Sequence, residues 1–389
     1  MRVDSGRKVL LVVSGCLVAF TLLGGILGRS LAVEGTYAFL KLFNEVLYLV
    51  RNNYVEAVDE GALMEGAYRG MLENLDPMGE YLSPEEFRRA SRGERNGPAD
   101  VGTTLSKRRE YIVIVNVTEG SPAQKAGLGT GDAILTIDRK STRRMGVWQA
   151  SQALQGKAGT TVRLDVIRTT DARSEAIELV RRPPVRAPLQ ASVLEPGVGL
   201  LRLGGLDPGE GDRVRKALES LRAQGVRRLL LDLRANTGPS LDEAVRTASV
   251  FMGEGKVVTI ADRKAGTSDL KSGASGPAWK GPVVVLVGEG TAGPGEVLAA
   301  ALRDRAGASL VGEKTWGLGS VQKIIPLPGG DGIRISVGKF LSPGGKEWNG
   351  TGLSPDVEQA AGSGESKQDL QLQKGLEVLK AGGEERKAA

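Results

Sequence analysis

Hydrophobic positions change their spacing along this chain, and the changes divide it into segments with different predicted structures. From residue 37 to residue 92, apolar residues recur at intervals of three and four, as on one face of a helix. Within residues 97–183 they alternate, as in the strands of a compact β-rich module. Within residues 193–357 short apolar runs alternate with amphipathic stretches, and residues 366–389 predict a C-terminal helix and tail.

The third segment has the pattern of a mostly parallel sheet with helices on both faces. Continuous apolar runs at Leu229–Leu233 and Val283–Val287 are typical of buried strands. Gly211–Gln224 and Leu241–Met252 are predicted helices, and strands that alternate with helices favour an α/β fold. Ligands and catalytic groups collect beyond the carboxyl ends of such strands, so we expect Gly288–Gly295 to lie at a functional site.

An uncharged apolar run at residues 9–28 follows a basic start. A helix of this length, at about 1.5 Å rise per residue, crosses a hydrocarbon core of ~30 Å, with the basic side expected in the cytoplasm. This predicts a cytoplasmic N-terminus at residues 1–8, a single-pass anchor in the inner (cytoplasmic) membrane, and soluble domains that are periplasmic or extracytoplasmic. A cleaved signal peptide is the alternative, although no A-x-A site ends the run. Val13–Cys16 resembles a lipoprotein cleavage box, but the apolar run continues well past it.

Composition excludes several kinds of site. The 389 residues include no histidine and one cysteine, which excludes Ser-His-Asp and Cys-His catalysis, histidine-ligated metals, thiolate zinc clusters and intrachain disulfides. We predict no metal and no cofactor. The net charge of +6 is spread along the chain without a dense basic block, so no nucleic-acid partner is predicted.

Two stretches, GEGTAGPGEVLAAALRD at residues 288–304 and GEKTWGLGSVQ at residues 312–322, resemble the carboxyl-terminal processing peptidases. These are S41 serine peptidases with a Ser/Lys dyad. In the family the first stretch carries the nucleophilic serine. The second carries the lysine that acts as general base and a glutamine that orients it.

The resemblance places residues without catalytic groups at both dyad positions. Alignment on Glu296 puts Gly293 at the nucleophile position, and alignment on Val321-Gln322 puts Leu318 at the base position, with the family's separation kept. Neither side chain can act as acid, base or nucleophile. Gln322, at the position of the orienting residue, is retained.

The resemblance continues toward the N-terminus. LFNEVLYLVRNNYVEAVDEGALMEGAYRGMLENLDPMGEYL follows the family's N-terminal helices, except that Met78-Gly79 replaces a habitual His-Ser. In the next segment, a predicted strand at Ala133–Ile137, a predicted helix at Val147–Leu154 and the run EGSPAQKAGLGTGDAILTID resemble a PDZ domain. PDZ domains capture a terminal carboxylate on backbone N–H groups. The resemblance places that loop at Val101, Gly102, Thr103 and Thr104; the alternative is a PDZ domain kept only for packing or dimerisation.

The run LDLRANTGPS at residues 231–240 resembles the family's turn that binds the oxyanion of the tetrahedral intermediate. Loss of one such N–H donor costs about 2.7–4 kcal/mol of barrier lowering. Gly238 keeps its place, but Pro239 stands where the family has a second glycine, and proline has no N–H. An ordinary strand-to-helix turn is the alternative.

Two other functions stay open. Gly288–Gly293 spells G-x-G-x-x-G after a predicted buried strand, as in a nucleotide-binding protein. An active serine-type endopeptidase would need displaced catalytic residues, for which Thr291, Lys314 and Ser320 are the candidates. Whether the chain is an enzyme is therefore uncertain.

The leading prediction is an S41-type α/β peptidase core, a mixed and mostly parallel sheet with flanking helices, with N-terminal helices and an inserted PDZ domain. The function predicted with it is that of a membrane-anchored, proteolytically inactive pseudopeptidase. Its predicted partners are protein C-termini, an active peptidase or another cell-envelope protein.

Overall fold

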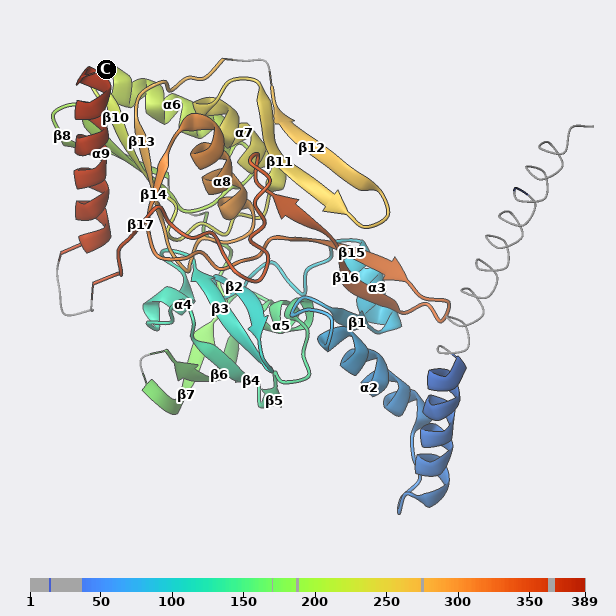
Figure 1. Cartoon of the computed structure of the whole chain (residues 1–389). Helices are drawn as coiled ribbons and strands as arrows, with labels where there is room; N and C mark the ends of the chain where they lie inside the picture. Colours follow the sequence, from blue (N-terminus) through green and yellow to red (C-terminus); the bar gives the residue numbers. More distant parts are fainter. Residues whose placement is uncertain are drawn as a thin grey trace, which may run out of the picture. The chain divides into compact units, whose positions relative to one another are not determined.

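The computed structural model describes residue 14 and residues 37–169, 171–186, 189–273, 276–362 and 368–388 (Figure 1). The predicted anchor lies outside these residues, apart from Ser14. In the part of the chain that is described, no helix is both long and apolar enough to cross a membrane. The longest helix there with defined bounds, α9 (Leu370–Ala388), carries charged side chains along its length. The predicted single-pass inner-membrane location is contradicted by this finding.

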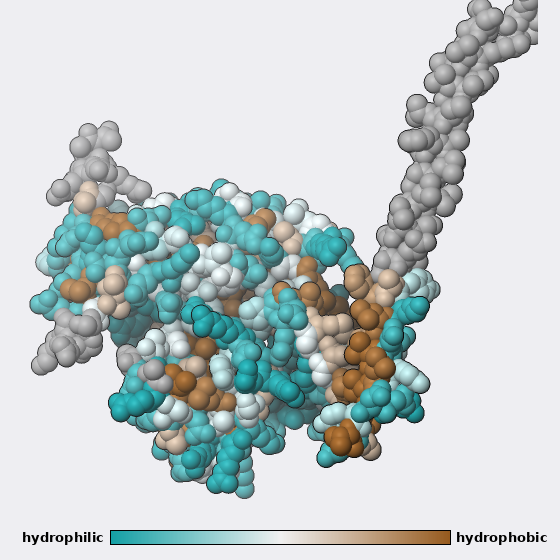
Figure 2. Space-filling view, turned by 60° about the horizontal axis from the view of Figure 1, so that its bottom comes forward, coloured by the Kyte–Doolittle hydropathy of each residue, from teal (hydrophilic) through white to brown (hydrophobic). Residues whose placement is uncertain are grey.

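The chain divides into two compact units, Met1–Tyr68 and Arg69–Ala389. In the first unit, a helix over residues 37–53 and the start of α2 (Glu60–Glu73) are described. Many of their apolar side chains are exposed, and Figure 2 shows hydrophobic surface over this helix pair. Of the helical segment predicted at residues 37–92, the structure confirms helices at residues 37–53, in α2 and in α3 (Pro84–Ser91). The prediction is wrong at Glu80–Leu82, which form the strand β1, and the large apolar exposure was not predicted.

A β-rich module opens the main part of the second unit. One sheet has the order β2-β3-β4-β6-β7, with β5 paired to β4. The strands are β2 (Thr103–Arg108), β3 (Tyr111–Val117), β4 (Ala133–Ile137), β5 (Lys140–Ser141), β6 (Thr161–Arg168) and β7 (Asp171–Val180). The helices are α4 (Pro122–Lys125) and α5 (Val147–Leu154). The strand and helix predicted here, β4 and α5, are confirmed.

Alternation along β3 gives this sheet two different faces. Ile112 and Ile114 belong to the core of the module, while Val113 and Val115 belong to a separate apolar cluster outside it. Successive side chains of a strand point to opposite faces, so this strand serves two interfaces at once.

The C-terminal half contains a six-stranded sheet in the order β17-β14-β13-β10-β9-β8. All its pairings are parallel except that of β8 with β9. The strands are β8 (Leu189–Glu195), β9 (Val198–Leu203), β10 (Arg228–Asp232), β13 (Val283–Val287), β14 (Ser309–Gly312) and β17 (Val357–Glu358). The mostly parallel sheet predicted from the buried apolar runs is confirmed.

Helices cover both faces of this sheet (Figure 1). On one face lie α6 (Glu210–Ala223), α7 (Leu241–Phe251) and α8 (Pro294–Ala306), and their apolar side chains pack with Leu229 and Val285 in the largest core. On the other face α9 packs against Leu230 and Val284. The continuous apolar runs of β10 and β13 follow from this double covering.

A five-stranded antiparallel sheet, which the sequence patterns did not predict, flanks this core. Its order is β1-β16-β11-β12, with β15 paired to β16. The strands are β1 (Glu80–Leu82), β11 (Gly255–Asp262), β12 (Gly266–Ser272), β15 (Ser320–Pro326) and β16 (Gly332–Leu341). β15 carries Gln322 directly after the loop that holds Leu318, so this sheet supports one side of the candidate site.

Candidate functional site

The turn between β13 and α8 has the backbone shape of a nucleophile turn but no side chain at its tip. Gly293 caps α8 with φ 55° and ψ −119°, a conformation that residues with a side chain rarely adopt. Strained strand-to-helix turns of this kind expose the catalytic serines of α/β-hydrolases. A Cβ atom built at Gly293 would have no neighbouring heavy atom within 4 Å. There is room for a nucleophilic side chain at this position, but glycine does not supply one.

Glu296, one turn into α8, ties this loop to the loop of residues 312–319. Its carboxylate accepts hydrogen bonds from the N–H groups of Gly293 (2.9 Å), Gly317 (2.8 Å) and Leu318 (2.8 Å) and from the Thr315 hydroxyl. Burial raises the pKa of Glu296 to about 7, although these hydrogen bonds oppose the shift. In the sequence, Glu296 served only to align the motif. Its position three residues after Gly293, as in a capping box, is the signal from which its role could have been predicted.

At the predicted base position, Leu318 lies in an apolar environment. It packs against a cluster formed by Val113 and Val115 of β3 together with Ala292 and Trp316. The Arg108 guanidinium of β2 stacks over the Trp316 ring at 3.8 Å from its centroid. The predicted base position therefore contacts both the outer face of β3 in the PDZ-like module and apolar residues of the two site loops.

Gln322 lies close to the same loop, on β15. Its amide nitrogen donates to the hydroxyls of Ser320 (2.9 Å) and Ser336 (2.6 Å). Its amide oxygen is buried and accepts no hydrogen bond from any residue that the structure describes. A buried acceptor without a donor costs about 1–3 kcal/mol of stability.

The predicted oxyanion turn has no free pair of amide donors. The Gly238 N–H points to the Asn236 side-chain oxygen at 3.4 Å, and the backbone of Gly238 packs so closely on Leu206 that a Cβ would lie 2.3 Å from the Leu206 Cβ. Pro239 is exposed and has no N–H to donate. The Gly293 N–H is already bound by Glu296.

The glycines of the G-x-G-x-x-G stretch serve close packing. A Cβ on Gly290 would come within 2.4 Å of the Arg234 carbonyl oxygen, so this backbone lies directly on the neighbouring loop. At the N-terminus of α8, the Glu296 carboxylate occupies the place where a dinucleotide site would put its phosphates. The geometry does not support the nucleotide alternative.

The candidates for a displaced dyad are not brought together as one. The Thr291 hydroxyl is fully buried, donates to the Leu233 carbonyl (2.8 Å) and accepts from the Gly288 N–H (3.1 Å). Lys314 is exposed to solvent, and the Ser320 hydroxyl accepts from Gln322. A Ser/Lys-type dyad needs a desolvated amine on its hydroxyl, which none of these residues provides.

The loop predicted to capture a chain terminus lies at the start of β2, an edge strand. Val101 is fully buried, and the Gly102 N–H is held by Asp100 at 3.0 Å. The Thr103 hydroxyl is buried and makes no hydrogen bond within the described part of the chain. The Thr104 hydroxyl lies 2.9 Å from that of Thr237, across the interface with the sheet domain. A PDZ ligand adds as a further strand along the free edge of a strand that follows a glycine turn. The role of this loop in binding a chain terminus stays a prediction.

A cavity of about 520 Å³ opens between the end of β3 and the carboxyl ends of the parallel strands. Asn116 and Gly290 line it, together with Arg234. Desolvation lowers the pKa of Arg234, but hydrogen bonds to Asp232 and Asp369 outweigh it and raise the pKa. Through Asp369 this arginine fastens the start of α9 to the strand ends.

Three family descriptions match successive parts of the chain. Residues 30–86 match the activating protease CtpB N-terminal domain, residues 113–168 match a PDZ domain, and residues 197–359 match peptidase family S41.

Curated relatives and a solved structure agree with these matches. A carboxyl-terminal-processing protease of Picosynechococcus is 32% identical over 85% of this chain and 83% of its own length. Carboxy-terminal processing protease CtpA of Bacillus subtilis is 28% identical, over 89% of this chain and 74% of its own. The structure of a photosystem II D1 C-terminal processing protease superposes with a TM-score of 0.69 at 29% identity, covering 79% of this chain and 84% of that one. The chain therefore belongs to the carboxyl-terminal-processing protease family, the S41 peptidases with a PDZ domain.

Proposed function

We propose that this member of the family is a pseudopeptidase, which binds the C-termini of other proteins through its PDZ domain and does not cleave them. The observation that carries the proposal is the environment of Leu318, where an apolar contact with β3 occupies the predicted base position. A general base must present a titratable group to the nucleophile, and leucine has none.

Three further features support loss of the chemistry. Gly293 has no side chain, Pro239 has no N–H, and the Gly293 N–H is bound to Glu296. Removal of a single nucleophile that acts in a catalytic unit already costs about 10⁶ in rate. Here nucleophile, base and one oxyanion donor are absent together, so residual catalysis by the same mechanism is not expected.

The retained Gln322 fits the same interpretation. Its buried amide oxygen receives no hydrogen bond from the described residues. This is expected if the glutamine has been kept while the lysine that it would orient has been replaced by Leu318. Under the alternative of an active peptidase, Thr291 and Lys314 would carry the reaction. The hydrogen bonds of Thr291 and the exposure of Lys314 argue against that alternative.

The experiment compares the full chain with a triple variant, Gly293→Ser, Leu318→Lys and Pro239→Gly, which restores the family residue at each altered position. Both are incubated with an unfolded protein that ends in apolar residues and a free carboxylate. Intact-mass spectrometry reports cleavage, and fluorescence anisotropy of a labelled peptide with the same end reports binding. The matched control carries Leu318→Met in place of Leu318→Lys and so lacks only the amine.

The proposal predicts that the natural chain binds the peptide and leaves the protein intact. Cleavage by the triple variant, absent from the matched control, would show that the site is otherwise whole. If the natural chain cleaves, and Thr291→Ala or Lys314→Ala abolishes the cleavage, the chain is an active peptidase with displaced residues and the proposal is wrong.

A further inference from the structure

We propose that this chain has a second binding site, a basic hollow at the amino ends of the parallel strands, which takes an acidic peptide segment of a partner protein. The basic hollow is defined by Arg222, Arg227, Trp279 and Lys280. The peptidase-like site lies at the carboxyl ends of the same strands, so the inference does not rest on the proposed function.

The basic hollow lies where two neighbouring strands of the sheet begin. One wall is the end of α6 with the turn that leads into β10, and the other wall is the segment before β13. Figure 1 shows α6 at the end of the second unit away from the PDZ strands. The hollow has a volume of about 840 Å³, which is within the range of ligand-binding clefts.

Three cations surround the hollow, and none of them has a carboxylate partner in the part of the chain that the structure describes. Arg222, Arg227 and Lys280 are all exposed. The Arg222 guanidinium donates to the Ala278 carbonyl at 3.0 Å, and that of Arg227 donates to the Val226 carbonyl at 2.9 Å. These bonds to backbone oxygens position two of the positive charges but do not neutralise them.

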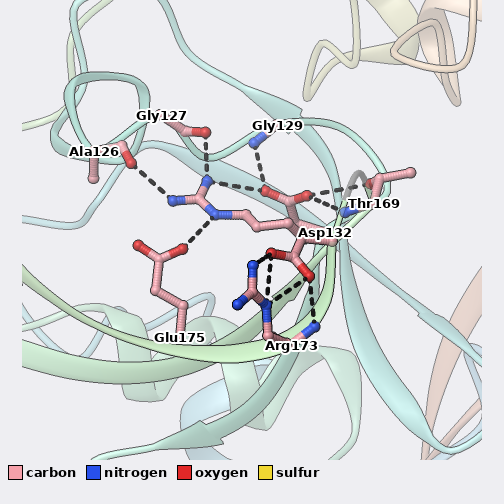
Figure 3. Close-up of polar contacts among 9 residues, drawn as sticks. Ala126, Gly127, Gly129, Asp132, Thr169, Arg173 and Glu175 are labelled. Carbon is pink, nitrogen blue, oxygen red and sulfur yellow. Dashed lines mark hydrogen bonds and ion pairs between the residues drawn. The ribbon is translucent and has the colours of Figure 1, made fainter.

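Several arginines elsewhere in the chain are neutralised by carboxylates. Figure 3 shows two such pairs in the PDZ domain: Arg173 binds Asp171 at 3.0 Å, and Arg168 binds Glu175 at 3.0 Å. At the basic hollow the carboxylate among the described lining residues, Glu219, forms no ion pair with the cations. The hollow therefore presents an excess of positive charge, to which an acidic ligand is complementary.

The hollow also contains an indole N–H without an acceptor. Trp279 is 2% exposed, and its Nε1 atom is buried and makes no hydrogen bond to any described residue. A Cβ built at Gly281, another lining residue, would be 3.1 Å from Cζ2, a ring atom on the same edge as Nε1. Buried N–H groups are normally paired, and an unpaired one lowers stability. A ligand oxygen at this edge would supply the missing acceptor.

The two kinds of surface in the hollow select a ligand that is both acidic and apolar. Trp279 and Val226 are buried apolar residues beneath the exposed cations. Carboxylates accept strong hydrogen bonds from guanidinium and ammonium groups, and an indole N–H can donate to the same kind of oxygen. A segment with aspartate or glutamate around an apolar side chain meets both requirements, and the hollow has room for more than a single small anion.

The first experiment measures binding of a short peptide that alternates glutamate with phenylalanine, by anisotropy of an uncharged dye. Its C-terminus is amidated, because a PDZ loop needs a free terminal carboxylate. The full chain is compared with Arg222→Glu plus Lys280→Glu. The matched control is Arg263→Glu plus Lys264→Glu, which makes the same change of charge on the exposed turn after β11.

The inference predicts that the natural chain binds this peptide. The variant with both charges of the hollow reversed should bind it about ten-fold more weakly, and the matched control should stay within about two-fold of the natural chain. Equal loss in both double variants would overturn the inference, because binding would then follow net charge alone. Absence of binding by the natural chain would overturn it as well.

The second experiment tests the indole N–H with Trp279→Phe, which keeps an aromatic ring and removes the donor. Because the donor has no partner among the described residues, the melting temperature should not fall, whereas affinity for the peptide should fall about five-fold. Unchanged affinity would overturn the role of Trp279. The double variants change exposed side chains alone, so they decide the inference if Trp279→Phe fails to fold.

Competition with glutarate at constant ionic strength separates a peptide from a small anion. The inference predicts that glutarate displaces the peptide at least about ten-fold less effectively than unlabelled peptide does. Equal potency would make the hollow a small-anion site and overturn the peptide ligand. None of these results bears on the pseudopeptidase proposal, which is tested with a free C-terminus and by cleavage.

Discussion

The buried carboxylate of Glu296 predicts a pH dependence of stability that a single substitution should remove. Its pKa is raised from 4.5 to about 7, chiefly by desolvation. For a group whose pKa is higher in the folded state, the stabilisation is fully present below the unfolded pKa and is lost as the pH rises through the folded pKa. The window therefore runs from about pH 4.5 to about pH 7.

The magnitude follows from the size of the shift. One pKa unit corresponds to about 1.4 kcal/mol, so the rise at Glu296 corresponds to about 3 kcal/mol of unfolding free energy lost between pH 5 and pH 8. Glu296→Gln cannot ionise and should lack this loss. Its amide nitrogen will face N–H donors such as those of Gly317 and Leu318, so its stability should be lower at every pH.

The assay is urea unfolding of the natural chain, Glu296→Gln and the exposed control Glu219→Gln at pH 5 and pH 8, at constant ionic strength. The measured quantity is the difference in unfolding free energy between the two pH values. Glu80, whose pKa is also raised by desolvation, is present in all three proteins and cancels in the comparison. If Glu296→Gln loses as much stability over this range as the natural chain, the carboxylate does not titrate there and the reasoning is refuted.

Three further predictions concern single residues. Gly293→Ala should lower the unfolding free energy by about 1–2 kcal/mol in urea titrations despite the open space, because φ is 55°; no change would mean that the turn relaxes. Thr103→Val removes a buried hydroxyl that has no partner among the described residues, so it should preserve stability. It should weaken binding of the apolar-ended peptide, measured by anisotropy, about five-fold, as expected for loss of one hydrogen bond. Unchanged affinity would exclude this hydroxyl from the peptide site. Arg234→Met should lower the unfolding free energy by about 3 kcal/mol and with it the melting temperature. The substitution leaves the buried carboxylate of Asp232 with one arginine and frees Asp369, the residue before α9. A loss under about 1 kcal/mol would contradict this prediction.

The local sequence pattern was sufficient to predict helices and strands whose formation depends on residues close together in the chain. β13 and α5 begin and end at the predicted residues, because period and apolar run length are properties of a few consecutive side chains. The antiparallel strands β15 and β16 were missed because most of their residues are only half buried, which blurs the alternation of apolar and polar positions. Likewise, the apolar run at residues 9–28 supported a membrane location that the described helices contradict.

For the site, the sequence by itself determined which groups are absent. No rotation or packing can give Gly293 a nucleophile, Leu318 an amine or Pro239 an N–H. Only the tertiary structure decided what replaced them. Glu296 reaches the 315–318 loop, and Leu318 packs on Val115, through contacts between residues far apart in the sequence that no local period records. Chemical capability resides in the side chain, whereas burial and pKa depend on which distant surfaces the fold brings together.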